Sequence, residues 1–462
     1  MKRRIALGLA LALGAGHAAA SHDVRAFGAA GDGRTKDTAA IQRALDVCAK
    51  SGGGRVVVPP GTYLIGSIYL GDGTELHLEK GATLLGSPDL ADYNAPDAYP
   101  QNFGSVNEGW SAKHLILALE KRDVSITGRG AIDGNGRAFF ADKPQFRGTV
   151  CWRDGGINAR DYKHQGRPGQ EIVFIECKGV AVRDVTFRDM SCWSCFFYGC
   201  ENVTVGGVTV RNGLLNLNTD GFDVDSCRNV RIGDCDIVTG DDAIAIRGSP
   251  ARLRNPAKVC ENVRVSNIVC RVSADGVRVG VGEGTIRDVR ISDMKIEHAG
   301  RGLHVQCCYG KNPRKGVDIS GVTFERITIR DVAQAILVGA GSPHSKATLG
   351  NISFDGIDAE SEMPIAVAGG GETRARAVSF ANCTFRPVRS RQGPVEDREA
   401  GKLSVDNVGA IRIEKADGVS FRASTLRWDG NADPHITCAF SLHDTEAPFV
   451  DGASRMEDRK AP

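Results

Sequence analysis

Two short acidic segments contain the residues of this chain that are best suited to chemistry. Asp220 lies in the first, and the pair Asp241 and Asp242 begins 21 residues later in the second, with glycines beside both. Carboxylates held together can serve as general acid and general base on a sugar linkage. No histidine or cysteine cluster with metal-ligand spacing accompanies them, so we expect neither a metal nor a cofactor. We therefore predict that these three aspartates are catalytic.

A repeating pattern predicts how the two segments meet. Segments of the form Val/Ile-x-Val/Ile/Phe recur every 23 to 41 residues, and apolar and polar residues alternate within each of them. The pattern lacks the leucine signature of horseshoe repeats and favours an all-β, single-stranded, right-handed parallel β-helix. In such a solenoid, residues one repeat apart become neighbours. The repeats begin at Val180, Val203, Val230, Val263, Val289, Val317, Ile352, Val378 and Val419.

A solenoid needs a cover over its open ends. Asp37 and Thr38 offer a helix N-cap, and apolar residues then follow at helical spacing as far as three consecutive glycines at 52–54. We expect a short N-terminal capping helix there. Two polar excursions, 134–170 and 387–407, leave the coil, and each is either the rim of a binding face or a solvated insertion.

The N-terminus predicts export. Residues 1–20 begin with three cations, continue as an apolar run and end in three alanines, as a secretory signal does. We expect a periplasmic or secreted protein, with a β-helix domain over 21–450 and a polar tail over 451–462. Without the signal the formal net charge of +2 becomes −1, which gives no indication of nucleic-acid binding. No later stretch is long enough to insert into a membrane, and we expect a monomer.

Fourteen cysteines in an exported chain would ordinarily suggest disulfides. Here, however, four of them recur three residues before the first valine of a repeat, which predicts a ladder of buried thiols. These four are Cys177, Cys200, Cys227 and Cys260. The pairs Cys192/Cys195 and Cys307/Cys308 are the places where we expect a disulfide instead.

The acidic segments and the N-terminal region resemble a known family. Asn218-Thr219-Asp220-Gly221 and Gly240-Asp241-Asp242 are similar to the paired boxes of the polygalacturonase family of glycoside hydrolases, family 28. Stretches 31–38, 58–63 and 78–82 resemble the opening of the wider pectin-degrading β-helix superfamily, so the likeness covers about 24–330. It implies hydrolysis with inversion, in which Asp241 protonates the leaving oxygen while Asp220 and Asp242 hold and deprotonate water.

Two boxes depart from the family pattern. Gly282-Glu283-Gly284 stands where the family has Gly-His-Gly, and His304 and Gln306 replace the arginine and lysine of a bacterial Arg-Gly-Leu-Arg-Ile-Lys box. Neutral side chains cannot match the two-point grip of an arginine on a carboxylate. We therefore expect a pectic or other acidic polysaccharide other than plain polygalacturonate, whose leaving-side sugar is neutral or is a uronate held elsewhere.

The predicted substrate-binding residues surround these boxes. Arg247 occupies the place of a family lysine, and Glu283 either caps its turn or replaces the missing histidine. Trp193 and Tyr309 are candidates to stack on a sugar, although Trp193 could equally pack beneath the site. The full set comprises Asn218, Arg247, Glu283, His304 and Gln306.

Two other functions remain open. A lyase or C5-epimerase on the same scaffold could use a calcium site made from Asp220, Asp223, Asp225, Asp241 and Asp242. A β-helix that binds glycans without cleaving them would fit the two altered boxes.

Overall fold

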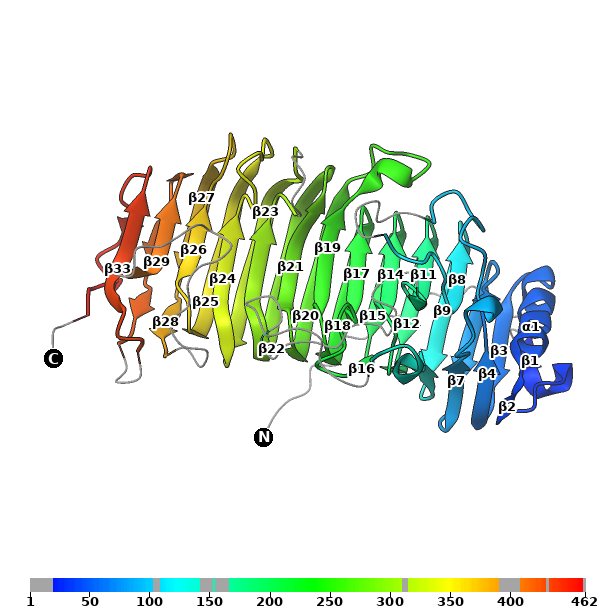
Figure 1. Cartoon of the computed structure of the whole chain (residues 1–462). Helices are drawn as coiled ribbons and strands as arrows, with labels where there is room; N and C mark the ends of the chain where they lie inside the picture. Colours follow the sequence, from blue (N-terminus) through cyan, green and yellow to red (C-terminus); the bar gives the residue numbers. More distant parts are fainter. Residues whose placement is uncertain are drawn as a thin grey trace.

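The chain winds into an elongated ladder of parallel strands, seen in the computed structural model of Figure 1. The structure describes residues 20–102, 109–141, 153, 166–309, 315–389, 408–428 and 432–459. Strands pair in parallel with strands one coil earlier and one coil later, which forms two long sheets, called sheet 1 and sheet 2 here. The predicted right-handed parallel β-helix is confirmed, but the signal segment and most of the two excursions lie outside the described residues.

The elements are as follows. Sheet 1 contains β1 (Ser21–Asp23), β2 (Asp32–Lys36), β3 (Gly54–Val58), β4 (Gly61–Ile65), β6 (Thr74–Leu78), β7 (Ala82–Gly86), β9 (Arg122–Gly128), β10 (Ala131–Asp133), β12 (Lys178–Arg183), β13 (Thr186–Arg188), β15 (Glu201–Gly206), β16 (Thr209–Arg211), β18 (Arg228–Thr239), β20 (Cys260–Val272), β23 (Asp318–Ile329), β25 (Leu349–Ser361), β27 (Ala375–Ala381), β28 (Thr384–Pro387), β30 (Ala416–Asp417), β31 (Ser420–Arg422), β32 (Thr425–Leu426) and β34 (Phe449–Val450). Sheet 2 contains β5 (Ile68–Tyr69), β8 (Ile116–Leu119), β11 (Ile172–Ile175), β14 (Cys195–Tyr198), β17 (Phe222–Asp225), β19 (Ile244–Gly248), β21 (Asp275–Gly282), β24 (Val332–Gly339), β26 (Ile365–Ala368), β29 (Val408–Glu414) and β33 (Ile436–His443). The long strand β22 (Thr285–Gln306) belongs to both sheets. The helices are α1 (Thr38–Lys50) and the short 3-10 turns η1 (Val24–Phe27), η2 (Leu90–Asp92), η3 (Gly136–Ala138) and η5 (Pro250–Arg252).

The predicted repeat matches the register of sheet 1 with one exception. The valines that begin successive repeats pair directly from Val180 through Val289. The next partner of Val289 is Val322 rather than Val317, so the prediction for that coil was wrong by five residues. The error arose because 317–319 is also an alternating Val-x-Ile, and sequence alone cannot tell which of two such segments takes the paired position.

Identical side chains stack inside the coil, which stabilises neighbouring turns through close contact. The rings of Phe324, Phe354, Phe380 and Phe421 stack in order, with centroids 5.0, 4.9 and 4.8 Å apart. The thiol ladder is confirmed as well, since its four cysteines are buried and form no disulfide. The backbone N–H of Cys200 donates to Sγ of Cys227 over 3.2 Å, one turn along.

The disulfide prediction was wrong. Cys192, Cys195, Cys307 and Cys308 are all buried, and none of them forms a disulfide. Cys195 points into the coil and Cys192 packs in a separate apolar cluster outside it, so the two face opposite sides of the wall. Side chains that alternate across a strand point apart, and adjacent or nearby cysteines in this pattern do not meet.

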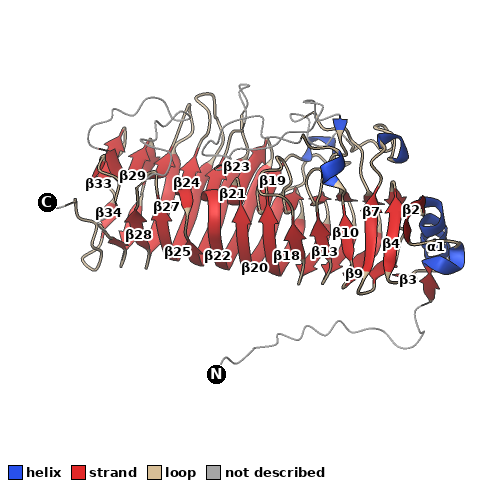
Figure 2. Cartoon of the chain, turned by 60° about the horizontal axis from the view of Figure 1, so that its bottom comes forward, coloured by secondary structure: helices blue, strands red, loops and turns tan. Residues whose placement is uncertain are grey.

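The predicted N-terminal helix covers the first coil, at one end of the ladder in Figure 2. Helix α1 buries Ile41, Leu45 and Cys48 on the expected face. Asp37 stands at the N-cap position, but its side chain makes no capping bond to the helix. The carboxylate instead accepts the backbone N–H groups of residues 30 and 31 over 2.7 and 3.0 Å, so that part of the prediction was wrong.

The other end of the ladder is covered less completely. Trp428, Phe440 and Met456 pack against the core there while remaining partly exposed. Among the residues described, no helix is both long enough and apolar enough to cross a membrane.

Candidate active site

Two neighbouring strands of sheet 2 position the acidic segments. Asp220 lies two residues before β17, and Asp242 lies two residues before β19. The strands pair with Phe222 opposite Ile244, and this register places Asp220 beside Asp242. One turn of the coil is 22 residues here, so the predicted meeting of the two segments is confirmed, with Asp242 at the paired position and Asp241 one residue before it.

The small residues of both segments allow the two turns to approach closely. A Cβ at Gly240 would lie 2.0 Å from the carbonyl oxygen of Asn216, and one at Gly221 would lie 2.4 Å from that of Ala243. Thr219 links the turns, because its hydroxyl oxygen accepts the backbone N–H of Gly240 over 3.0 Å. The glycines and the threonine therefore set the distance between the acids.

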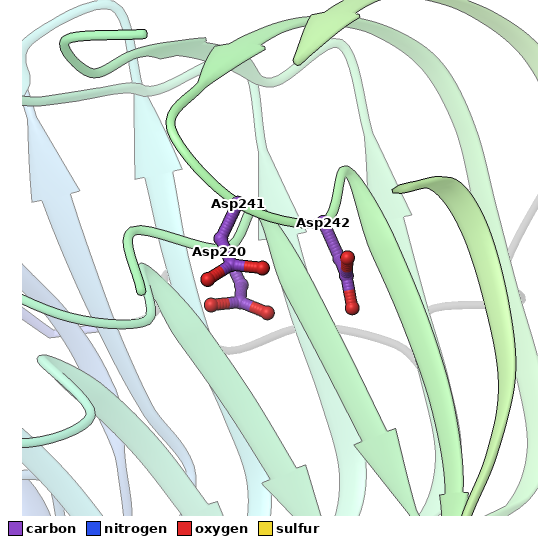
Figure 3. A group of neighbouring side chains, drawn as sticks. All are labelled: Asp220, Asp241 and Asp242. Atoms are coloured by element: carbon purple, nitrogen blue, oxygen red, sulfur yellow. The ribbon is translucent and has the colours of Figure 1, made fainter. Parts of the chain in front are cut away.

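The three predicted catalytic acids meet in one place. Asp220, Asp241 and Asp242 are 4, 6 and 2% exposed, and one oxygen from each lies within 4.8 Å of the others. In Figure 3 the carboxylates of Asp220 and Asp241 lie close together, with Asp242 beside them. A group of three such acids, called the triad below, can hold a proton, a water molecule or a cation.

Asp241 is held from the preceding turn. Its Oδ2 accepts the backbone N–H and the side-chain amide of Asn218 over 3.0 and 3.2 Å. A proton on Asp241 would therefore reside on Oδ1. Asn218 is in turn fixed by Arg167, whose Nη2 donates to Asn218 Oδ1 over 3.0 Å.

Arg167 is a site residue that sequence reasoning noted only as part of an excursion. Its guanidinium also donates to the carbonyls of Ser191 and Leu217 and is 1% exposed. Rings of Trp110 and Phe140 lie 5.7 and 5.2 Å from it. Burial lowers the pKa of Arg167 from its ordinary value.

Burial and mutual repulsion change the proton affinity of the triad. Burial, with the charges of Asp241 and Asp223, raises the pKa of Asp220 well above its ordinary value. Burial and the charge of Asp275 also raise the pKa of Asp242, while Arg278 opposes the rise. Carboxylates in such contact titrate as one unit, which retains a proton at a pH where isolated aspartates have lost theirs.

The row of acids continues into the next coil, where the sequence prediction missed Asp275. Its backbone N–H donates to Asp242 Oδ1 over 3.0 Å, and its Oδ2 lies 2.6 Å from His304 Nδ1. Although burial opposes the shift, His304 and the nearby arginines lower the pKa of Asp275 to about 2. Asp275 is therefore an ionised neighbour of the triad.

Glu283, the predicted replacement for the family histidine, lies elsewhere. It is exposed in the turn after β21, whereas Asp275 begins that strand. The length of the strand separates them by roughly 25 Å at 3.3 Å per residue. The position next to Asp242 in the following coil belongs to Asp275, and the substrate-binding role of Glu283 stays a prediction.

Arg247 and Trp193 are buried against the wall of the coil. Arg247 is 4% exposed, and its guanidinium lies 3.6 Å from Asp225 and 3.8 Å from Asp223. The ring of Trp193 lies 4.5 Å from the same guanidinium and packs on Trp110 and Phe196. Asp223 and Asp225 therefore face Arg247. Among the residues that the structure describes, the oxygens grouped closely enough to hold a cation come from the triad.

Two cavities of about 510 and 600 Å³ open among the described residues, and neither is lined by a triad acid. The smaller contains Asn212, which donates to the carbonyl of Thr219 over 3.1 Å. Both are lined mainly by charged side chains of both signs, which indicates ordinary solvated surface.

A parallel β-helix that brings three carboxylates together on adjacent coils defines a class of polysaccharide-cleaving enzymes, the β-helix glycoside hydrolases. The model of glycosyl hydrolases family 28 matches residues 48–386. This chain belongs to that family.

The relatives agree with this assignment. The chain is 28% identical over 313 residues to a probable polygalacturonase of Vitis vinifera, covering 65% of this chain and 60% of the relative. It is 28% identical over 367 residues to the exo-poly-alpha-D-galacturonosidase of Dickeya chrysanthemi, covering 71 and 58%. The chain thus spans about three fifths of the length of these relatives. The family 28 exopolygalacturonase of Yersinia enterocolitica has the same fold, with a TM-score of 0.67 at 20% identity, over 94% of this chain and 78% of that structure.

Proposed function

We propose that this chain is an exported, inverting hydrolase that cleaves a pectic or other acidic polysaccharide different from plain polygalacturonate. The observation that supports this most strongly is the triad, in which three buried carboxylates from two adjacent coils have oxygens within 4.8 Å of one another. The names of the relatives above give polygalacturonate as their substrate. This chain differs from the family pattern at His304 and Gln306, which supports a substrate other than plain polygalacturonate.

The roles within the triad follow from its contacts. Asp241 donates a proton from Oδ1 to the leaving oxygen, because its Oδ2 already accepts two N–H groups of Asn218. Asp220 and Asp242 hold the attacking water and take its proton. Burial and repulsion raise the pKa values of Asp220 and Asp242, so the triad keeps one proton at a pH where isolated aspartates have lost theirs. With that proton on Asp241, the carboxylates of Asp220 and Asp242 are ionised and can act as bases.

The anomeric configuration of the first product tests this mechanism. Inverting enzymes place acid and base carboxyls about 6.5 to 9.5 Å apart, with a water between them, and retaining enzymes about 5 to 5.5 Å. Proton NMR spectra during the first minutes of hydrolysis should show inversion. A retained anomer would overturn the single-displacement mechanism.

A panel of pectic and non-pectic polysaccharides tests the substrate, and we expect the highest kcat/KM on a branched or mixed acidic chain. The highest kcat/KM on plain polygalacturonate would contradict the proposal.

Export is tested by N-terminal sequencing. Processing near Ser21 in the exported protein would support export, whereas an intact residue 1 on cell-associated protein would contradict it.

A lyase or epimerase is the second candidate, because the grouped triad oxygens could also hold a cation. A lyase would make an unsaturated product that absorbs in the ultraviolet, and chelator would stop it. We expect neither result. Sustained binding of glycans without any product would instead indicate a binding protein.

A further inference from the structure

The side chains at the two positions where the family carries cations are used internally. Besides its contact with Asp275, His304 has its Nε2 2.6 Å from Oε1 of Gln306. The amide nitrogen of Gln306 donates to the carbonyl of Cys308 over 2.6 Å. His304 is 1% exposed. A uronate on this side of the triad therefore needs a cation from another position.

Arg278 provides a cation one coil earlier. It pairs in register with His304 and shares the outward face of sheet 2. Its Nη1 lies 3.5 Å from Asp242 Oδ2, and 14% of its side chain is exposed. The guanidinium carbon lies 4.2 Å from the ring centroid of Tyr309, which is itself 41% exposed. The guanidinium thus stands between a triad acid and an exposed aromatic ring.

The charges in contact around Arg278 are of both signs, so the case for an anionic ligand rests on the guanidinium of Arg278 itself. Asp242 and Asp275 are the carboxylates in contact here, and Arg278, Arg301 and His304 lie against them. A guanidinium carries five N–H donors in a planar fork, so Arg278 can contact Asp242 and a second carboxylate together. An exposed tyrosine ring beside it offers a flat surface for the face of the same sugar.

The geometry points to Arg278 as the specificity-determining residue that binds a uronate carboxylate next to the scissile bond, with Tyr309 packing against that sugar. This inference rests on the proposed function and goes beyond it, because it selects the uronate over the neutral sugar. It also assigns the role of the family's cations at positions 304 and 306 to Arg278, on the same strand as Asp275.

Binding to a protein that cannot turn over separates recognition from catalysis. In the Asp241→Asn background, calorimetry would compare trigalacturonic acid with its methyl ester. Adding Arg278→Met should lower affinity for the acid by about 10- to 100-fold, the range for a charged hydrogen bond, and affinity for the ester less than about threefold. Arg278→Lys should give an intermediate loss, and Tyr309→Ala should weaken both ligands.

Arg264→Met is a matched control, because Arg264 pairs with Asp288 on the exposed face of sheet 1. It should change neither affinity. An equal loss for acid and ester in Arg278→Met, or no loss, would overturn the inference while leaving the hydrolase proposal intact. Failure of the Asp241→Asn protein to bind either trimer would overturn the inference, whereas the proposed function is tested separately by the panel of polysaccharides.

Discussion

The outer face of sheet 2 differs on the two sides of the triad. On β11 and β14, before it, the outward side chains are apolar and buried beneath Tyr99, Trp110 and Leu253. On β21 and β22, after it, the outward side chains are Arg278, His304 and Gln306. One side is covered by the chain itself and the other carries charge and an exposed ring. From this difference we expect substrate to bind mainly on the charged side.

Removing the acid at the boundary between the two sides should have the largest effect. Asp241→Asn should lower kcat by at least about 10² to 10⁴, the usual contribution of general acid catalysis. The variant should keep its far-ultraviolet circular dichroism spectrum and its ligand affinity. Near-normal turnover on the preferred polysaccharide would remove Asp241 from the mechanism.

Asp275→Asn tests the buried ion pair on the charged side. This change leaves His304 and Arg301 without their carboxylate, and breaking a buried ion pair costs about 3 to 5 kcal/mol of unfolding free energy. Since the folded-state pKa of Asp275 is lowered to about 2 from 3.8, its stabilising contribution is complete above about pH 4 and is lost as the pH falls toward 2. Denaturant unfolding at several pH values would measure this, and we expect kcat to fall as well. Unchanged stability at neutral pH would contradict the role of this pair.

The apolar side predicts where the polymer is cut. Because Tyr99 and Trp110 cover β11 and β14, a long chain cannot continue over them, and we expect attack from chain ends. Viscosity should then fall slowly relative to the release of reducing ends. Trp110→Ala should open this side and raise the share of internal cuts, at a cost of about 3 to 5 kcal/mol in stability. A rapid early loss of viscosity with the unaltered enzyme would contradict terminal attack.

The smallest change in unfolding free energy that we predict comes from charge repulsion within the triad. The folded-state pKa of Asp220 is raised above 3.8, so the folded protein binds this proton more tightly than the unfolded chain and loses stability as the pH rises above about 4. Asp220→Asn removes this effect while abolishing activity. We expect it to stabilise the protein by about 0.5 to 2 kcal/mol at pH 7 and by nothing near pH 3. A variant less stable than the parent at pH 7 would refute the repulsion.

Sequence predicted the elements that depend on local pattern. Period-two alternation predicted the coil, and the interval between Asp220 and Asp241 predicted their meeting. Prediction from sequence failed where an irregular turn separates two paired strands. Between Asp242 and Asp275 the chain passes through η5, so this coil is longer than the one before it. The residue next to Asp242 could therefore not be found by counting along the sequence. The Gly-x-Gly turn at Glu283, eight residues beyond Asp275, was predicted to hold that position instead. Arg167 was missed for a similar reason, because it reaches the site from an excursion.

The link between Thr219 and Gly240 has an evolutionary consequence. All three acids and the residues that space them lie within 218–242, a contiguous segment slightly longer than one turn of the coil. The residues proposed to contact the sugar on the charged side come from later coils, around 275–309. Under the proposed roles, catalysis and substrate preference are encoded in separate stretches, and recombination or drift can alter one while the other is inherited unchanged.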